Sequence, residues 1–179
     1  MGQTGTMEKI VPAPPGDPRR PLGPRDPGDA WVEGDRGRFW GRFGSAGLLA
    51  HDPGKGILLQ HRALWSDHGG TWGLPGGALH QGEDPVTGAL REAFEEAAVP
   101  EGNVRVLFTS VFDVGYWSYT TVAVRVVEPF EPAITDPESI ELRWIPLGNV
   151  ARLNLHPAFA AAWPALSGKL LDHERAGAS

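Results

Sequence analysis

The sequence predicts an α+β domain in which helices pack on a mixed β-sheet. Strand-like segments stand in two blocks, of which the second is rich in β-branched residues, with one helical segment between the blocks and another at the end. The chain has 179 residues, of which 41% are hydrophobic and 21% charged, so it is long enough for one domain with a hydrophobic core. These two observations indicate a single layered domain.

The first 37 residues are predicted to form a tail with extended, polyproline character. Residues 12–27 hold seven prolines and few large apolar side chains, so burial cannot offset the entropy that is lost on ordering. We interpret residues 1–37 as a solvated leader, with docking on a partner as the alternative. The folded domain is then expected at residues 38–174, followed by a short tail at residues 175–179.

Two β-hairpins and one further strand are predicted within this domain. Residues 45–52 and 56–63 have the character of strands on either side of an Asp-Pro-Gly-Lys-Gly turn. Residues 104–114 and 118–128 are rich in β-branched residues and are joined by a tight Gly-Tyr-Trp connection. Residues 139–146 are predicted to form another strand.

Two helices are predicted, one in the middle of the domain and one at its end. The first covers residues 84–97. The second covers residues 156–174, and we expect Pro164 to interrupt or kink it, because proline removes a backbone donor inside a helix.

The first helix carries an unusual concentration of acidic residues. Glu92, Glu95 and Glu96 have i, i+3 and i+4 spacing, which places their carboxylates on one face. Arg91 is the one cation among six carboxylates between Glu83 and Glu101, and it is placed to pair with Glu95. Converging carboxylates suit a hard divalent cation such as magnesium, while a solvated acidic helix face is the alternative.

The loop before this helix also favours a metal site. Pro75, Gly76 and Gly77 form a backbone that can approach a ligand closely and offer a carbonyl oxygen to a metal. Without the acidic helix, the same residues would be interpreted as an ordinary turn.

The span from Gly77 to Val99 resembles the signature box of the Nudix hydrolases, G-x5-E-x7-R-E-U-x-E-E-x-G-U, where U is a bulky aliphatic residue. The residues in register are Gly77, Glu83, Arg91, Glu92, Glu95, Glu96 and Val99. Ala93 is smaller than the pattern requires, and Ala98 replaces its glycine. Alanine resists a left-handed helix cap by about 1 kcal/mol, which bears on the helix exit and not on the metal ligands.

The resemblance extends over residues 38–166 and is to an actinobacterial MutT-like branch of the family. The similar segments are WGRFGSAGLLAHD, LLQHRALWSDHGGTWGLPGGA, WSYTTVAV and ELRWIPL. The resemblance implies an α/β/α sandwich and metal-dependent cleavage of a nucleoside diphosphate linked to another group. It also implies a nucleotide as the small-molecule substrate, with oxidised guanine nucleotides such as 8-oxo-dGTP as the leading class.

Catalytic roles follow from the same resemblance. Glu92, Glu95 and Glu96 are expected to ligate Mg²⁺, or Mn²⁺ in its place, with the Gly76 carbonyl completing the shell. Arg91 would hold a glutamate in place. A supporting metal or hydrogen-bonding role is expected for Glu83.

The general base is less clearly indicated than the metal ligands. Glu138 is favoured over Glu141, because the alternation of a strand would direct Glu141 to solvent. Both residues could equally be surface acids.

Substrate contacts are predicted from residue type alone. Arg42 and Arg62 are candidates for the phosphates, although each could pair with a surface acid, and Gly77 permits close approach of the ligand. Aromatic rings that could stack on a base are Trp65, Trp72, Trp117, Tyr119 and Trp144, of which we favour Trp72, Trp117 and Tyr119. Asn154 could contact a purine edge or be a turn residue. No chemistry is assigned to His61, His68, His80 and His156, which lack metal-ligand spacing.

Composition excludes several other classes. The net charge of −6 argues against polymeric nucleic acid, and the absence of a long apolar run argues against a membrane span. The chain has no cysteine, and its Pro-rich and Gly-rich start lacks the apolar core of a secretory signal, so we expect a cytoplasmic protein. A homodimer remains open.

Three alternatives to the leading function remain. A dinucleoside polyphosphate hydrolase is the enzymatic runner-up, because those enzymes often carry a tyrosine in the region after the box where Tyr116 lies. ADP-ribose hydrolases often carry a proline there, and this chain has Val114 and Gly115. The alternative of another class is a Nudix module that binds nucleotide without cleaving it.

Overall fold

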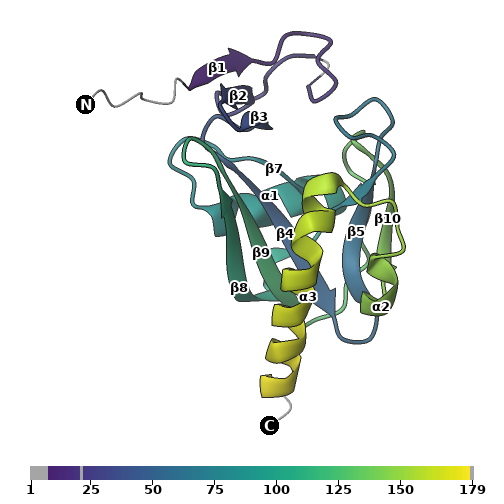
Figure 1. The fold of residues 1–179 in the computed structure, drawn as a ribbon. Coiled ribbons are helices and arrows are strands. Elements are labelled where there is room, and N and C mark those ends of the chain that lie inside the picture. Colours follow the sequence, from purple (N-terminus) through teal and green to yellow (C-terminus); the bar gives the residue numbers. More distant parts are fainter. Residues whose placement is uncertain (1–7, 21, 178–179) are drawn as a thin grey trace, which may run out of the picture.

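The computed structural model describes residues 8–20 and 22–177. The fold has a central β-sheet with a helix on each face and a small second sheet near the N-terminus (Figure 1). Parts of the two predicted tails, at residues 1–7, 21 and 178–179, lie outside the described residues. None of the helices in the described ranges combines the length and hydropathy of a membrane span.

The central sheet confirms the predicted hairpins and the mixed topology. Its strands run in the order β10-β5-β4-β9-β8, with short β6 and β7 pairing β5 and β4, and only the β4–β9 pair is parallel among these strands. The strands are β4 (Ser45–Asp52), β5 (Gly56–Arg62), β6 (Trp72–Gly73), β7 (Gly76–Ala78), β8 (Val104–Asp113), β9 (Ser118–Val126) and β10 (Ser139–Ile145).

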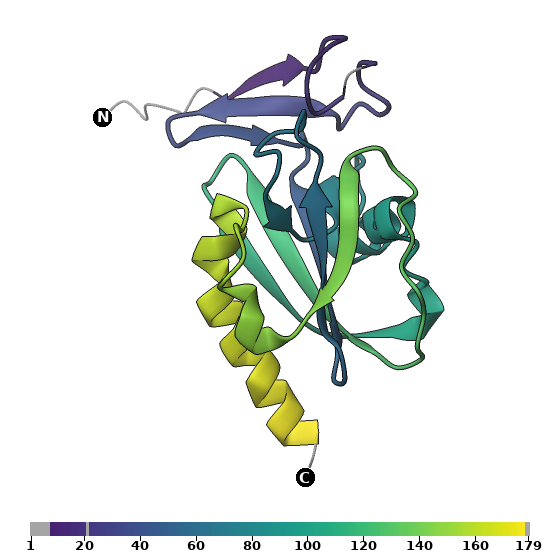
Figure 2. The ribbon, with the colours of Figure 1, turned by 90° about the vertical axis from the view of Figure 1, so that its right-hand side faces the viewer.

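Alternation along β4 and β5 supplies both faces of the sheet with core residues. One face carries Leu49 and Leu59 and packs against α3 (Pro157–Gly177). The other face carries Leu48 and Leu58 and packs against α1 (Pro85–Ala97). Figure 2 shows the two helices on opposite sides of the sheet, so the predicted sandwich is confirmed.

Local chemistry defines both ends of α1. The Asp84 carboxylate accepts from the Val86 and Thr87 backbone N–H groups, and proline occupies the first helical position. The helix ends where Ala98 takes a left-handed conformation, with φ of 53°, and its N–H donates to the Phe94 carbonyl. Short elements complete the chain: the 3₁₀ turn η1 (Glu101–Asn103) and α2 (Leu147–Val150).

The prediction of an extended tail over residues 1–37 is wrong for the described part of that range. β1 (Lys9–Pro12), β2 (Ala30–Gly34) and β3 (Gly37–Trp40) form a three-stranded antiparallel sheet. Trp31 and Trp40 pack edge to face, 5.0 Å apart, and form a small core with Ala78 of the main domain. Pro12 ends β1, and Pro14, Pro15, Pro18, Pro24 and Pro27 lie in the connection between β1 and β2, so none of these prolines prevents strand pairing.

The last helix also differs from its prediction. α3 runs through Pro164 without interruption and continues to Gly177, beyond the predicted boundary at residue 174. An internal proline costs about 3 kcal/mol, but Phe159, Trp163 and Leu170 of this helix are buried against the sheet, and their burial outweighs that cost.

Candidate active site

The acidic face of α1 separates its glutamates by burial. Glu92 and Glu96 are each 4% exposed, whereas the Glu95 side chain is 53% exposed at the rim. The Gly76 N–H donates to Glu96 Oε2 at 2.9 Å. A Cβ at Gly77 would lie 2.6 Å from Glu92 Oε2, so a side chain there would displace this carboxylate from its present position.

Arg91 connects the helix to the loop that precedes it. Its Nε and Nη2 donate to the two Glu83 oxygens at 2.8 and 2.9 Å, and its Nη1 donates to Glu92 Oε1 at 2.7 Å. The predicted pair with Glu95 is longer, at 3.4 Å. The hydrogen bond from Arg91 lowers the pKa of Glu83, and Glu83 is thus the principal partner of Arg91 in place of Glu95.

The two buried glutamates carry negative charge that their surroundings do not fully neutralise. Burial, with Glu92 and Glu138 nearby, raises the pKa of Glu96 well above its ordinary value. Burial also raises the pKa of Glu92, against the opposing hydrogen bond from Arg91. An all-oxygen donor set with surplus negative charge fits a hard divalent cation, so the residues present are suited to the metal that the Nudix resemblance implies.

Glu138 lies beside this pair, and its partner comes from the N-terminal segment. Arg20 Nη1 donates to Glu138 Oε1 at 2.6 Å, and Arg20 Nε donates to Asp29 Oδ2 at 3.2 Å. Glu138 is only 7% exposed, whereas Glu141 is partly exposed and pairs with Arg143. The sequence prediction missed Arg20 and Asp29. Two consecutive arginines in a segment otherwise treated as solvated tail were the available indication.

Arg62, at the end of β5, supplies a second basic group near the acidic cluster. Arg62 is buried, and its Nε and Nη2 donate to the Asp67 carbonyl at 3.0 and 2.9 Å. Burial, with the Arg19 charge nearby, lowers the pKa of Arg62 to about 10 against the attraction of Glu96. Burial raises the pKa of Tyr119 to about 12. The structure thus brings Arg62 and Tyr119 to the acidic cluster.

Comparison with known proteins agrees with this geometry. The NUDIX domain profile matches residues 41–166. This chain belongs to the Nudix hydrolase family. The match covers more than half of the chain and includes the whole of α1 and the β7 loop.

Named relatives of this Nudix hydrolase occur in actinobacteria. It is 46% identical over 153 residues to a Mycobacterium tuberculosis protein named "Putative 8-oxo-dGTP diphosphatase 3", covering 79% of this chain and 70% of that one. It is 41% identical to a Bifidobacterium longum "Nucleoside triphosphate pyrophosphatase/Nudix hydrolase fusion protein", covering 80% of this chain and 32% of that one.

Solved structures confirm the fold. A Nudix hydrolase from M. smegmatis, RenU, superposes with a TM-score of 0.73 at 45% identity, covering 81% of this chain and 96% of that one. A C. elegans Ap4A hydrolase superposes with a TM-score of 0.60 at 20% identity, covering 72% and 98%. The second likeness concerns the fold alone.

Three of the predicted substrate contacts of this Nudix hydrolase have other surroundings. Trp72 is only 8% exposed and stacks on His61 at 4.6 Å, so it belongs to the core and offers no open face. Trp117 stacks on Phe39 at 4.4 Å, which attaches it to the N-terminal sheet. Arg42 is exposed, and its guanidinium lies 5.3 Å from the Phe43 ring centroid. No contact within the described ranges links Arg42 to the acidic cluster.

The other aromatic and polar candidates are also placed by the structure. Trp65 is exposed on the loop after β5, and Trp144 packs against Phe130. The Asn154 side chain is exposed, and the Asn154 backbone carbonyl accepts from the Trp72 backbone N–H at 2.8 Å.

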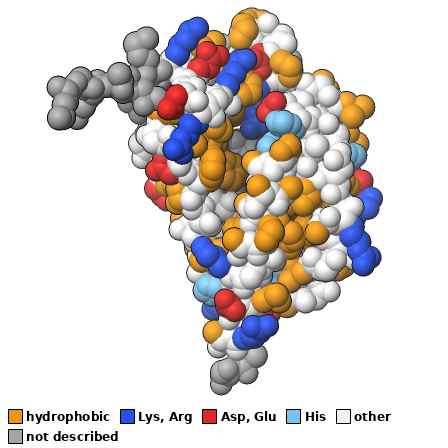
Figure 3. All heavy atoms as spheres, viewed as in Figure 1, with side chains coloured by type: hydrophobic (Ala, Val, Ile, Leu, Met, Phe, Trp, Pro, Cys, Tyr) orange, Lys and Arg blue, Asp and Glu red, His pale blue; other side chains and the backbone are white. Residues whose placement is uncertain are grey.

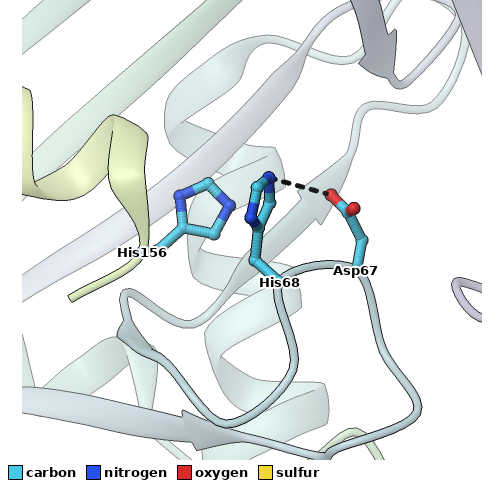
Figure 4. Close-up of side chains that lie close together, drawn as sticks. All are labelled: Asp67, His68 and His156. Atoms are coloured by element: carbon cyan, nitrogen blue, oxygen red, sulfur yellow. Dashed lines mark ion pairs between the residues drawn. The ribbon is translucent and has the colours of Figure 1, made fainter. Parts of the chain in front are cut away.

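The prediction that the histidines lack the arrangement of metal ligands needs a correction, because the fold brings two of them together with an aspartate. Ligand atoms of Asp67, His68 and His156 lie within 4.8 Å of one another (Figure 4). They come from distant segments, so a search for local spacing could not find them. His156 Nδ1 accepts from the Ala158 N–H at 3.2 Å, which places the ring proton on Nε2. Burial and the Arg62 charge lower the pKa of His156 to about 4.

A cavity of about 460 Å³ separates the N-terminal sheet from the loop after β5. Figure 3 shows a hollow below that sheet with basic, acidic and histidine side chains around it. The cavity is lined by Asp17, Pro18, Trp31, Arg38, Ser66, Asp67 and His68. A volume of this size suits a small-molecule ligand.

Proposed function

We propose that this chain is a Mg²⁺-dependent pyrophosphohydrolase that cleaves a phosphoanhydride of nucleoside di- or triphosphates, with oxidised guanine nucleotides of the 8-oxo-dGTP type as the leading substrates. The observation that carries the proposal is the buried pair Glu92 and Glu96, whose raised pKa values reflect negative charge in need of a cation. The name of the M. tuberculosis relative supports the choice of base.

In this proposal Glu92, Glu95, Glu96 and the Gly76 carbonyl hold the metal. Bound there, the ion would neutralise phosphate charge and increase the acidity of a water molecule. The remaining steps belong to the protein's own side chains. Arg91 keeps Glu92 oriented through its 2.7 Å hydrogen bond, and Glu83 fixes Arg91.

Glu138 is proposed as the group that accepts the proton of the attacking water. Its Oε1 is engaged by Arg20, whereas no hydrogen bond to its Oε2 is found within the described residues. Oε2 is therefore the proposed acceptor atom. Glu141 is less suited, because Arg143 engages it at the exposed side of β10.

Arg62 and Tyr119 are proposed to contact the substrate beside the metal ligands. Arg62 uses Nε and Nη2 on the Asp67 carbonyl, which leaves Nη1 to point elsewhere. A guanidinium donor suits a phosphate oxygen. Gly77 contributes by keeping the β7 backbone free of a side chain at Glu92.

The experiment that tests the proposal is a substrate screen with product masses. Ordinary and oxidised nucleoside di- and triphosphates, ADP-ribose and diadenosine polyphosphates are each incubated with the protein and Mg²⁺, with EDTA as the control. Preferential cleavage of oxidised guanine nucleotides supports the proposal. Activity confined to diadenosine compounds overturns the substrate assignment, and nucleotide binding without product overturns the enzymatic one.

The dinucleoside polyphosphate alternative loses its supporting residue. Tyr116 Oη donates to the Gly37 carbonyl at 2.9 Å and accepts from the Arg36 N–H at 3.2 Å, so its hydroxyl is occupied by the β2–β3 turn. We also propose a cytoplasmic location, where nucleotide pools are found. The homodimer stays a prediction that sedimentation would test.

A further inference from the structure

Strand β8 forms one edge of the central sheet and has no partner on its outer side. It pairs with β9 alone, and no other segment within residues 8–20 and 22–177 bonds to its backbone from outside. Figure 1 shows β8 at the side of the sheet opposite β10. With ten residues, it is the longest strand in the described ranges. An open edge of this length is a template for pairing with another strand.

The connection that follows β8 determines which of its backbone groups point outward. The Val114 N–H donates to the Trp117 carbonyl at 3.0 Å, and no bulge interrupts the second half of β8. Hydrogen-bonded and non-hydrogen-bonded pairs alternate along an antiparallel ladder. Thr109, Val111 and Asp113 therefore direct their N–H and C=O groups away from β9, where the described chain offers no partner.

The side chains along this edge are apolar and exposed, unlike those of the opposite edge. Val111 and Phe112 are each more than half exposed. β10, at the other edge, carries Glu141 and Arg143, which are joined as an ion pair. Charged side chains commonly protect an edge strand against pairing, whereas β8 carries charge only near its two ends.

The order of residues along β8 suits an antiparallel second copy of the same strand. In two-fold pairing about Ser110, Thr109 of each copy lies opposite Val111 of the other, so the outward backbone groups of both copies meet. Phe108 packs on the face that α3 covers, and Phe112 shares this face by alternation. The same pairing places Phe108 of each copy opposite Phe112 of the other, and aromatic cross-strand pairs are stabilising.

The charged ends of β8 are complementary in this arrangement. Arg105 and Asp113 are both exposed, and neither takes part in an ion pair in the described part of the chain. Pairing about Ser110 brings Asp113 of one copy to a diagonal position from Arg105 of the other, at both ends of the interface. Diagonal cross-strand neighbours are within reach of a long side chain.

We propose that the outer edge of β8 is a homodimer interface, in which β8 of two copies pairs antiparallel and joins the two central sheets into one. The occupant is a second copy of this chain, because β8 itself supplies the backbone groups, the aromatic rings and the opposite charges that this edge requires. A two-fold axis uses the same surface on both subunits. None of the residues of the acidic cluster belongs to β8, so the interface does not depend on the proposed function.

Sedimentation velocity of the full chain tests this interface. We expect a monomer–dimer equilibrium over roughly a hundredfold range of protein concentration, because association follows mass action. Val111→Lys should raise the dissociation constant of the dimer by about tenfold or more, since it places a hydrated cation on the edge of each copy. Val111 is exposed, so this variant should fold, which urea unfolding checks. Ile140→Lys is the matched control on exposed β10 and should leave the dissociation constant unchanged.

Arg105→Glu and Asp113→Lys test the register. Each variant alone should dimerise about tenfold more weakly, because like charges then face each other at both ends of the interface. An equimolar mixture of the two variants should regain the affinity, because each introduced charge then faces an opposite one. This recovery cannot arise from damage to either fold.

A monomer at every concentration overturns the inference. A dimer that persists unchanged in Val111→Lys, or that is weakened equally in Ile140→Lys, also overturns it, because another surface then holds the two copies together. A mixture that associates no better than its two components overturns the antiparallel pairing about Ser110.

Discussion

At the scale of the residue, burial distinguishes glutamates that look equivalent in the sequence. Glu95 and Glu96 are neighbours in one helical turn, yet Glu95 reaches solvent and Glu96 lies under β7. In a buried site, each additional carboxylate raises the free-energy cost of ionising the others. Glu96 is therefore costly for folding, which is expected of a side chain retained for chemistry.

Glu96→Gln is expected to abolish hydrolysis and to stabilise the metal-free protein. The amide oxygen can still accept from the Gly76 N–H, while the buried negative charge disappears. Because the folded pKa of Glu96 is raised, its charge lowers stability as pH rises above its unfolded value. In EDTA at neutral pH, the free energy of unfolding should rise by about 1 kcal/mol.

Urea titration and product assays check this prediction. Glu101→Gln, on the exposed 3₁₀ turn after the same helix, is the control and should change neither quantity. Full turnover in Glu96→Gln would remove Glu96 from the metal set. Stabilisation of the variant by Mg²⁺ equal to that of the unaltered chain would do the same.

At the scale of the element, α1 ends at a residue that is poorly suited to its backbone conformation. Ala98 has φ of 53°, where a Cβ is strained, and yet it makes the helix-closing hydrogen bond. The buried packing of Ala93 and Ala97 against the sheet retains the helix despite this strain.

Ala98→Gly is expected to increase the free energy of unfolding by roughly 1 kcal/mol, because glycine adopts the left-handed cap without strain. Thermal and urea unfolding measure the change. Ala97→Gly is the matched control: its site is helical and buried, so the same substitution should destabilise. Destabilisation by both would show that Ala98 is not strained.

At the start of α3, His156 links stability to pH. Its folded pKa of about 4 lies below the ordinary value, so the unfolded chain binds more protons between these values. The free energy of unfolding is therefore highest at neutral pH, where His156 is uncharged in both states. It falls by about 2 kcal/mol, after a discount for partial exposure, as pH drops from about 6.5 towards 4.

His156→Asn should flatten this pH dependence while keeping an acceptor for the Ala158 N–H. The free energy of unfolding is measured by urea titration at pH 7 and pH 5 for both proteins. His173→Asn, on the exposed side of the same helix, is the control. A pH profile that is identical with and without His156 would contradict the assignment.

At the scale of the whole molecule, a few long-range contacts tie the N-terminal sheet to the main domain. Arg20 bridges Asp29 and Glu138, and the Trp117 indole donates to the Trp40 carbonyl at 3.0 Å. The sheet is small, so its position depends on these contacts more than on its own core.

Arg20→Met is expected to destabilise the protein by about 3 kcal/mol, because it leaves two buried carboxylates without their cation. Arg25→Met is the matched control: the Arg25 side chain is exposed and pairs with Asp136 at 3.3 Å, so its loss should cost about 1 kcal/mol or less. Adding Glu138→Gln to Arg20→Met should recover part of the stability. Equal effects of Arg20→Met and Arg25→Met would show that the Arg20 pairs are not buried in solution.

Local patterns were sufficient for much of the main domain. Both hairpins, the boundaries of α1 and the mixed sheet could be predicted, because turn residues, caps and periodicity act over a few neighbouring positions. The glutamate spacing likewise determined that Glu92 and Glu96 share one helical face.

Tertiary structure alone decided which side chains meet across long separations. The Arg20–Glu138 pair joins residues 118 positions apart, and it forms only because the N-terminal segment folds back onto the main domain. Composition suggested a solvated tail because prolines dominate the segment. It gave no weight to Trp31 and Trp40, which pack together and hold the N-terminal sheet on the main domain. The acidic helix was thus determined by local sequence. The position of the N-terminal segment, whose Arg20 bonds to Glu138, was determined by packing and by buried charge.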